Sequence, residues 1–248
     1  MARRVAIVTG GMGSIGTAIC VALAKMDLRV TALDHPSQQS RVEKWCDDRQ
    51  AEGVVIAAMT ADLVNYEQTR EAINNAAKPT GAVDVLVNAA GITRDSRFVK
   101  MHPAQWREVL AANLDSAFNC THAVFEGMCD RKFGRVVNIS SVNGQKGQFG
   151  QANYAASKAG MHGLTMSLAQ EGARSNVTVN TVSPGYIATP MTAAIKPEAL
   201  EKICAQIPVG RMGKPEEIAR VVAFLCADDS AYITGANIPV NGGLFISA

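Results

Sequence analysis

Aromatic residues are scarce in this sequence, and neither sign of charge dominates it. They make up 5% of the 248 residues, and 24 Lys and Arg nearly balance 22 Asp and Glu, for a formal net charge of +2. No run of basic residues is dense enough to indicate a surface for nucleic acid or membranes. No apolar stretch reaches the ~18 residues of a membrane span, and the apolar run 5–8 after Arg3-Arg4 is too short for the core of a signal peptide. These absences predict a cytoplasmic protein that binds neither nucleic acid nor membranes.

Cysteine and histidine spacings typical of metal sites are also missing. The six cysteines are scattered and include no CxxC pair: Cys20, Cys46, Cys120, Cys129, Cys204 and Cys226. Scattered thiols are typical of buried residues in a reducing compartment, and a disulfide framework or metal site is the disfavoured alternative. The four histidines show no ligand spacing either: His35, His102, His122 and His162. The sequence therefore implies no metal.

The chain does contain a regular alternation of strand-sized and helix-sized segments. Short β-branched runs occur at 5–9, 29–33, 54–59, 83–88, 134–140, 178–183 and 236–240, and longer helical patterns at 14–25, 67–77, 106–131, 152–171 and 215–227. Several of the short runs are apolar throughout, as expected of parallel strands covered on both faces. No linker or repeat interrupts the alternation. The order predicts an α/β fold, a single Rossmann-like domain over 1–248 with a doubly wound parallel sheet and helices on both faces.

A glycine-rich turn joins the first strand to the first helix. Glycines let the backbone turn sharply and approach a phosphate, and the free N–H groups of a helix start attract one. Such a turn can be purely structural, but on the first βα turn it lies where dinucleotides bind. We predict that it cradles a cofactor through Gly10, Met12, Gly13, Ser14, Ile15 and Gly16. The turn resembles the TGxxxGxG fingerprint of the short-chain dehydrogenase/reductase family, with Ser14 in place of the middle glycine.

Asp34 follows the second strand, roughly 20 residues after the glycine turn. A carboxylate at this place accepts hydrogen bonds from the ribose hydroxyls of NAD and repels the 2′-phosphate of NADP. The alternatives are a turn aspartate before His35-Pro36 and, because Arg41 is near, use of both cofactors. The sequence favours NAD(H) over NADP(H).

The family resemblance extends to other strand ends, where ligands gather in open α/β sheets. Asn88-Ala89-Ala90-Gly91 resembles the family's NNAG, with Ala89 in place of the second asparagine. The resemblance implies further cofactor contacts near the adenine ring and the nicotinamide, at Asp62, Leu63, Pro184, Gly185, Ile187 and Thr189.

Tyr154 and Lys158 are four residues apart in a helical stretch, so both side chains lie on one helix face. An ammonium beside a phenol lowers its pKa, and such a tyrosine can protonate a carbonyl oxygen as hydride reaches the carbon. Ser141, at the end of the fifth strand, can hold the same oxygen. A Tyr/Lys pair on a helix surface is the alternative. The resemblance also implies that Tyr154 and Lys158 contact the cofactor, and that Asn113 kinks a helix and anchors a water relay to Lys158.

The stretches 88–95 (NAAGITRD), 141–154 (SVNGQKGQFGQANY) and 183–191 (SPGYIATPM) resemble the acetoacetyl-CoA reductases of polyhydroxybutyrate synthesis. The resemblance implies reduction of acetoacetyl-CoA to (R)-3-hydroxybutanoyl-CoA, with a substrate site at Asp95, Lys100, Ser141, Gln148, Phe149, Gln151, Tyr154, Gly185 and Tyr186. Arg94, Arg97 and Lys100 add positive charge for CoA phosphates. Alternatively, the glutamines only satisfy loop backbone.

Two rival functions stay open: a 3-oxoacyl-[acyl-carrier-protein] reductase, and a regulator that binds the cofactor without turnover. The resemblance further implies a homotetramer built on the helices at 113–131 and 152–171, and a substrate flap over 192–206 that closes over the substrate.

Overall fold

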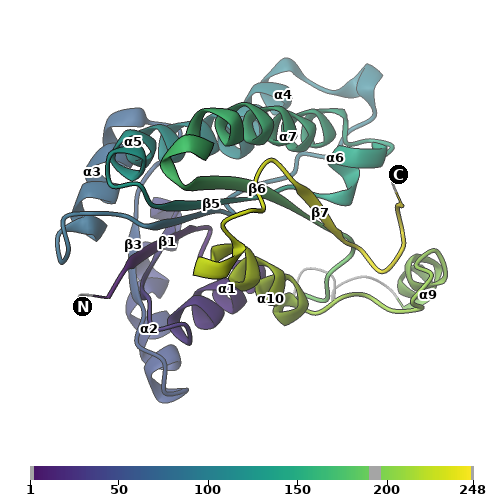
Figure 1. The fold of residues 1–248 in the computed structure, drawn as a ribbon. Coiled ribbons are helices and arrows are strands. Elements are labelled where there is room, and N and C mark those ends of the chain that lie inside the picture. The colour runs from purple at the N-terminus through teal and green to yellow at the C-terminus, as the bar shows by residue number, and fades with distance from the viewer. Residues whose placement is uncertain (1–2, 190–196, 247–248) are drawn as a thin grey trace.

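The structure, a computed structural model, describes residues 3–189 and 197–246. All seven strands form one parallel sheet in the order β3-β2-β1-β4-β5-β6-β7 (Figure 1). The strands are β1 (Val5–Thr9), β2 (Arg29–Asp34), β3 (Ala57–Thr60), β4 (Val85–Asn88), β5 (Gly134–Ile139), β6 (Val177–Pro184) and β7 (Asn237–Val240). This order confirms the predicted doubly wound parallel sheet.

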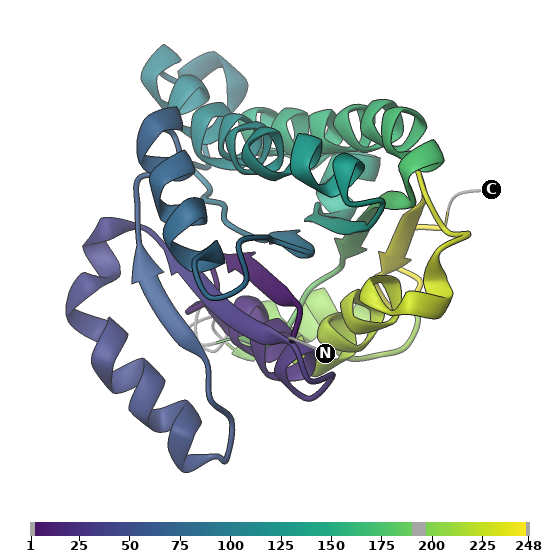
Figure 2. The ribbon, with the colours of Figure 1, turned by 60° about the vertical axis from the view of Figure 1, so that its left-hand side comes forward.

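Helices cover both faces of the sheet, as Figures 1 and 2 show from two sides. Alternate residues of β1 point to opposite faces because strand side chains repeat with a period of two. Ala6 and Val8 belong to the core under α1 (Ser14–Ala24), α2 (Val42–Ala51) and α10 (Pro215–Cys226). Val5 and Ile7 belong to the opposite core, under α3 (Tyr66–Ala77), α5 (Ser116–Asp130) and α7 (Ala152–Gly172). Every β1 residue is therefore buried, which explains its unbroken apolar run.

The remaining helices lie near the carboxyl ends of the strands. They are α4 (Pro103–Leu110), the short α6 (Val142–Lys146) and α9 (Pro197–Ala205). The single helix predicted over 106–131 is wrong in detail, because α4 begins at Pro103 and a π-helical turn, Ala111–Asp115, separates it from α5. His102 forms a capping box with Gln105 ahead of Pro103, a start signal that the pattern reading missed.

Two predicted strand starts are also wrong. Residues 54–56 and 83–84 have the composition of strand residues, but β3 begins only at Ala57 and β4 at Val85. Val54 donates its backbone N–H to the Arg49 carbonyl, which ends α2. Asp84 instead accepts from the Val5 N–H through its side chain. The flap predicted over 192–206 lies partly outside the described residues, and its described part contains α9.

The strand order reverses direction between β1 and β4, which places a crevice between their carboxyl ends. Thr9 at the end of β1 pairs in register with Asn88 at the end of β4. The glycine turn and the Asn88–Gly91 turn therefore face each other across this point. Ligands of open α/β sheets bind in such crevices.

Candidate active site

The glycine turn brings two backbone segments into a contact that only glycine permits. A Cβ on Gly16 would lie 2.1 Å from the Gly10 carbonyl oxygen, and Gly10 itself has φ +61°. Helix α1 then begins at Ser14, with Gly13 as an N-cap that has no side-chain capping bond. The first N–H groups of α1 are thus left without a side-chain cap, as an anion site at a helix start requires. Ser14 already has helical backbone, so the missing glycine imposes no strain.

Asp34 ties the glycine turn to the end of β2. Its Oδ2 accepts from the Met12 N–H at 3.1 Å and its Oδ1 from the His35 N–H at 2.9 Å. The side chain is half-buried and each carboxylate oxygen keeps a further lone pair. Arg41 donates to Gln38. Asp34 therefore stabilises the turn and can still accept hydrogen bonds from ribose hydroxyls.

The turn after β4 is fixed by β1. Thr9 Oγ1 accepts from the N–H groups of Ala89 and Ala90 at 3.0 and 3.1 Å. Asn88 donates to Thr121 and Asn138 in the core, and its buried Oδ1 has no partner among the described residues. Ala89 needs no side-chain bond here, because its backbone is what the turn uses.

The other predicted cofactor residues lie along the same edge of the sheet. Asp62 accepts from the Val64 N–H, and the Leu63 carbonyl accepts from Asn119. Pro184 ends β6, the Gly185 N–H donates to the Val240 carbonyl, and Ile187 bridges to Gly213. Thr189 is half-buried just beyond. All of them follow strand carboxyl ends, as expected from the sequence.

Ser141, Tyr154 and Lys158 come together where β5 meets α6 and α7. Ser141 is the N-cap of α6, and its side chain lies close enough to Tyr154 to influence the pKa of the phenol. Tyr154 lies on the first turn of α7, with Lys158 Nζ 5.7 Å from the centre of its ring. The helix spacing thus places both side chains on one face, as predicted.

The electrostatics of this cluster differ from the sequence-based prediction. Removal from water raises the pKa of Tyr154, the Ser141 hydrogen bond lowers it, and the nearby Asp95 carboxylate raises it further. The net direction is upward, so the predicted lowering by Lys158 is wrong for this arrangement. The reason is that Lys158 is buried and donates to the Ile139 carbonyl at 2.8 Å, while burial lowers its own pKa to about 8. A phenol with a raised pKa stays protonated near neutral pH and can act as an acid.

Asn113 lies in the π-helical turn, an irregularity at the position where the resemblance implies a kink. Its Oδ1 accepts from the Ile92 N–H at 2.7 Å, and its Nδ2 donates to the Ile92 carbonyl and to Ser157. A Cβ on Gly91 would lie 3.1 Å from Asn113 Oδ1 and 3.3 Å from Lys158 Nζ. Asn113, Gly91 and Lys158 therefore converge at one point, next to the turn after β4.

The predicted substrate residues fall into a bonded group and an exposed group. Gln151 donates to Asp95 at 2.9 Å and accepts from Asn143, so the bonds of this glutamine go to side chains and not to loop backbone. Gln148 accepts from Lys146, and Phe149 is 80% exposed with Arg97 beside its ring. Lys100 ends the exposed turn 98–100. Arg94 is paired with Glu108, which offsets part of the positive charge expected there.

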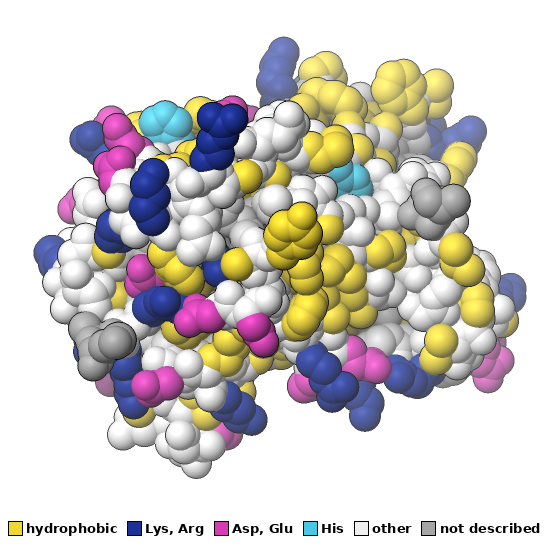
Figure 3. Space-filling view, in the orientation of Figure 1, with side chains coloured by type: hydrophobic (Ala, Val, Ile, Leu, Met, Phe, Trp, Pro, Cys, Tyr) yellow, Lys and Arg dark blue, Asp and Glu magenta, His cyan; other side chains and the backbone are white. Residues whose placement is uncertain are grey.

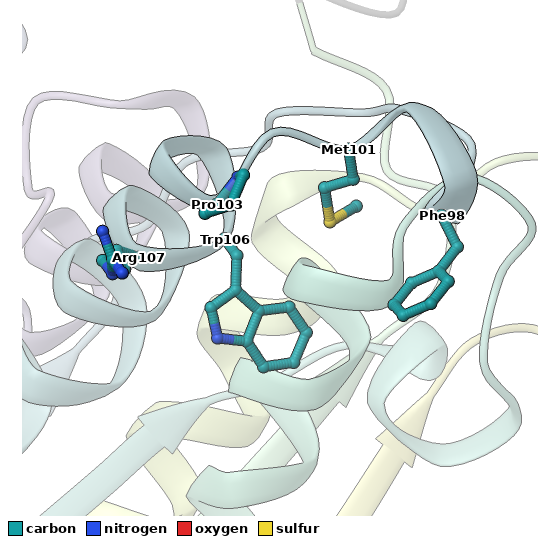
Figure 4. Close-up of a pocket in the computed structure, with 5 residues that line it drawn as sticks. All are labelled: Phe98, Met101, Pro103, Trp106 and Arg107. Carbon is teal, nitrogen blue, oxygen red and sulfur yellow. The ribbon is translucent and has the colours of Figure 1, made fainter.

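Two hollows border this region. One, of about 440 Å³, is lined by Phe98, Met101, Pro103, Trp106 and Arg107, all from the segment between β4 and α5 (Figure 4). Phe98 and Val99 of this segment are among the most exposed apolar residues of the described chain. Hydrophobic side chains gather over the same segment at the upper right of Figure 3. The other, of about 120 Å³, is lined by residues that include Tyr186, Ile187 and Asn241, beyond β6 and β7. Tyr186 thus lines the second hollow, directly after Gly185 in the chain.

Sequence reasoning missed three contributors to the site. Helix α6 and its Asn143 were not assigned a role, although a serine that ends a strand is a good N-cap signal. Trp45 of α2 donates to Thr17, which in turn donates to the Gly11 carbonyl and so braces the glycine turn. No sequence signal links Trp45 to that turn, because the contact spans 28 residues.

Within residues 3–189 and 197–246, no group of three or more His, Cys, Asp or Glu side chains could hold a metal ion. No helix in the same ranges is long and apolar enough to cross a membrane.

The sequence of this chain is similar to those of several known proteins. Residues 10–245 match the family described as enoyl-(acyl carrier protein) reductase. The acetoacetyl-CoA reductases of Allochromatium vinosum and Cupriavidus necator are each 54% identical to this chain, over 98% of it and 99% of their own length. A 3-oxoacyl-[acyl-carrier-protein] reductase of Pseudomonas aeruginosa is 41% identical over 98% of both chains. A seven-stranded parallel sheet, a glycine turn at its switch point and a Ser-Tyr-Lys cluster accompany these matches over nearly the whole length, and the chain belongs to the short-chain dehydrogenase/reductase family.

Proposed function

We propose that the protein is an acetoacetyl-CoA reductase, which reduces the 3-keto group of acetoacetyl-CoA to give (R)-3-hydroxybutanoyl-CoA in polyhydroxybutyrate synthesis. The observation that carries the reaction is the cluster of Ser141 and Tyr154 beside buried Lys158. The substrate rests on the similarity to acetoacetyl-CoA reductases along almost the entire chain.

In this proposal Tyr154 donates the proton that the keto oxygen takes up. The phenol is protonated at neutral pH, and Ser141 is proposed to hold the substrate oxygen beside it. Lys158, with a pKa of about 8, is largely charged at pH 7, and its ammonium is proposed to bind the hydroxyls of the nicotinamide ribose and so to fix the cofactor beside Tyr154. Asn113 positions this cluster through Ile92 and Ser157.

The described residues fit a nicotinamide dinucleotide. The close approach of Gly16 to Gly10 and the uncapped start of α1 form a pyrophosphate cradle, and Asp34 presents carboxylate oxygens to the adenosine ribose. When bound, the cofactor supplies the hydride that reduces the keto carbon. We propose that Asp62, Leu63 and the turn 88–91 hold its adenosine half, and that Pro184, Gly185, Ile187 and Thr189 hold the nicotinamide half together with Tyr154 and Lys158.

We propose that NADH is favoured over NADPH. Asp34 is half-buried at the end of β2, where a second negative charge on the ribose would meet its carboxylate at close range. Arg41 lies on the turn that follows and already donates to Gln38, which supports the same preference.

For the substrate, Asp95 and Gln151 form one wall beside Tyr154, and Tyr186 with Gly185 forms the other. Exposed Phe149 and Gln148 lie at the mouth, where an acyl arm can cover the phenyl ring. Lys100 supplies positive charge for the CoA phosphates.

We further propose that the chain acts as a single domain over 1–248 and assembles as a homotetramer. All seven strands belong to one sheet, which supports the single domain. The outer faces of α5 and α7 carry Phe118 and Met166, which are 50% and 53% exposed, and such apolar faces favour burial against another copy. All six cysteines are free thiols, which supports the reducing conditions of the cytoplasm.

The experiment that tests this function is steady-state oxidation of NADH and of NADPH with acetoacetyl-CoA as the acceptor. Strong turnover that favours NADH is the expected result. Turnover with NADPH alone keeps the reductase and removes the role given to Asp34.

The second candidate, a 3-oxoacyl-[acyl-carrier-protein] reductase, is favoured by the 41% identical relative of that name. A parallel assay with an acetoacetyl thioester of an acyl-carrier protein separates the two. Faster turnover of the carrier thioester favours this candidate. Absence of turnover with both thioesters favours a regulator that only binds the cofactor.

A further inference from the structure

Asn143, on the short helix α6, is joined to the reacting groups in two directions. Its backbone N–H donates to Ser141 Oγ at 3.1 Å, and its side-chain Nδ2 donates to Gln151 Oε1 at 2.9 Å. Gln151 Nε2 in turn donates to Asp95 Oδ2 at 2.9 Å. One residue therefore connects the hydroxyl beside Tyr154 with the carboxylate of the loop after β4.

This chain of amides has only one consistent direction. An ionised carboxylate accepts hydrogen bonds and cannot donate them, so Gln151 must turn its NH2 group toward Asp95. Its carbonyl oxygen then faces Asn143, which must present its own NH2 group. The charge at Asp95 thus fixes the orientation of both amides.

The bond to Ser141 has a consequence for the proton of its hydroxyl. A serine hydroxyl has one proton to donate and lone pairs that accept. Because Oγ accepts from the Asn143 N–H, that proton is directed toward a different acceptor. Tyr154 is a neighbour of this hydroxyl, and the substrate oxygen is proposed to lie beside both.

Close packing fixes helix α6 against α7, so the position of Asn143 is fixed relative to Lys158. A Cβ on Gly144 would lie 2.8 Å from Lys158 Cβ, so the backbone next to Asn143 packs directly on α7. On the other side, the Ser96 N–H donates to the Gly150 carbonyl at 2.8 Å, which joins the Asp95 loop to the loop before α7. The amide chain spans the gap between these two anchor points.

We propose that Asn143 is a positioning residue for the reaction, holding Gln151 and Asp95 against the substrate in register with Ser141. The proposal rests on the function proposed above and deepens it. Asn143 itself touches neither the reacting carbon nor the cofactor in this scheme. It sets the distance between the substrate wall and the proton-donating pair.

The test is a double-mutant cycle of Asn143→Leu and Gln151→Leu. Each change removes the bond between the two side chains, so each should lower kcat/KM for the thioester by about tenfold. The double variant should lose about as much as Gln151→Leu alone, because without Gln151 the Asn143 side chain has no bond to this chain left to lose. Losses that multiply, or an Asn143→Leu variant within twofold of the wild type, would overturn the proposal.

Gln145→Leu is the matched control, an amide-to-leucine change on the same helix. Among the described residues, the Gln145 side chain is not bonded to Ser141, Gln151 or Asp95, and its buried Oε1 has no partner. We expect near wild-type kcat/KM in Gln145→Leu. The dissociation constant for NADH should be unchanged in Asn143→Leu, Gln151→Leu and Gln145→Leu alike, since the amide chain does not reach the glycine turn.

A second measurement separates this proposal from the proposed function. Hydrogen exchange of the protein without substrate should increase in segments 94–97 and 147–151 for Asn143→Leu and not for Gln145→Leu. This readout needs no turnover, so it decides the role of Asn143 even if acetoacetyl-CoA is not the substrate. Unchanged exchange in both segments would show that Asn143 does not connect the two loops.

Discussion

The cofactor side and the substrate side of the site are built by different means. On the cofactor side, backbone contacts determine the shape: Gly16 against Gly10, and the Ala89 and Ala90 amides on Thr9. On the substrate side, side chains determine it, through the chain from Asp95 to Asn143 and the exposed ring of Phe149. A backbone-built site changes little when single side chains are exchanged, whereas a side-chain-built site can be retuned one residue at a time.

The largest expected effect comes from Tyr154→Phe, which separates chemistry from cofactor binding. The ring and its packing remain, but the donated proton is lost, so kcat should fall by roughly 10²–10⁴-fold. The dissociation constant for NADH, measured by fluorescence titration, should change less than threefold. Turnover close to that of the wild type would remove Tyr154 from the mechanism.

Next in size is Gly16→Ala, directed at the backbone-built side. The added Cβ would lie 2.1 Å from the Gly10 carbonyl oxygen. Because this oxygen belongs to the backbone, it cannot move aside as the end of a flexible side chain could. We expect NADH binding to weaken by at least about tenfold and stability to fall by about 1–3 kcal/mol. Gly163→Ala on α7, where an added Cβ meets nothing within 4 Å, is the control and should leave NADH binding unchanged.

Lys158 lies between the cofactor side and the substrate side, and Lys158→Met tests its charge through the pH dependence of the free energy of unfolding. The folded protein lowers the lysine pKa to about 8 from 10.5, so the unfolded chain binds the extra proton between these values. The buried charge therefore costs stability fully below about pH 8, by roughly 3 kcal/mol, and the cost disappears as the pH rises toward 10.5.

Urea unfolding of both proteins at pH 7, 9 and 10.5 measures this dependence. The free energy of unfolding of Lys158→Met minus that of the wild type should decrease as the pH rises. Loss of the bond to Ile139 adds an offset that does not depend on pH. A difference that stays constant with pH would mean that Lys158 is not buried as a charge.

The smallest expected effect is a change of cofactor preference in Asp34→Ala. Removal of the carboxylate eliminates the repulsion of a 2′-phosphate and one bond to the glycine turn, so the ratio of kcat/KM for NADH to that for NADPH should fall by about tenfold. Asp62→Ala, at the next strand end, is the comparison and should leave the ratio unchanged. An unchanged ratio in Asp34→Ala would restrict Asp34 to its turn role.

The same contrast explains which parts of the molecule could be predicted from the sequence. The sheet, the glycine turn and the Tyr154–Lys158 face depend on local patterns, namely apolar runs, glycine spacing and helical period. The direction of the Tyr154 pKa depends on where Lys158 Nζ points and on Asp95, which comes from another strand end. The partners of Gln151 also come from segments 8 and 56 residues away. Contacts of that kind leave no periodic trace in the sequence.

Element boundaries illustrate the same limit. Residues 54–56 resemble a strand, yet β3 starts later because the chain is still closing α2. The sequence predicts that Arg94 is a free positive charge, but Glu108 of α4 forms an ion pair with it. In both cases, the start of a strand and the pairing of an arginine depend on tertiary contacts that the local composition does not reveal.

The π-helical turn at Ala111–Asp115 changes which residues of one long helical segment face the interior. A π turn contains one residue more than an α turn, so it shifts the pattern of inward-facing residues that follows by one position. Before it, α4 packs against α7; after it, α5 packs against α3 and β5. Deleting one residue from this turn would restore a regular helix and leave the packing faces of α4 and α5 where they are, because the wider turn accommodates one extra residue. Deleting one residue within α5 would instead rotate everything after it by about 100°. The packing of the helices should therefore tolerate a single-residue deletion in this turn and not in the middle of α5, a contrast that a substitution scan does not test.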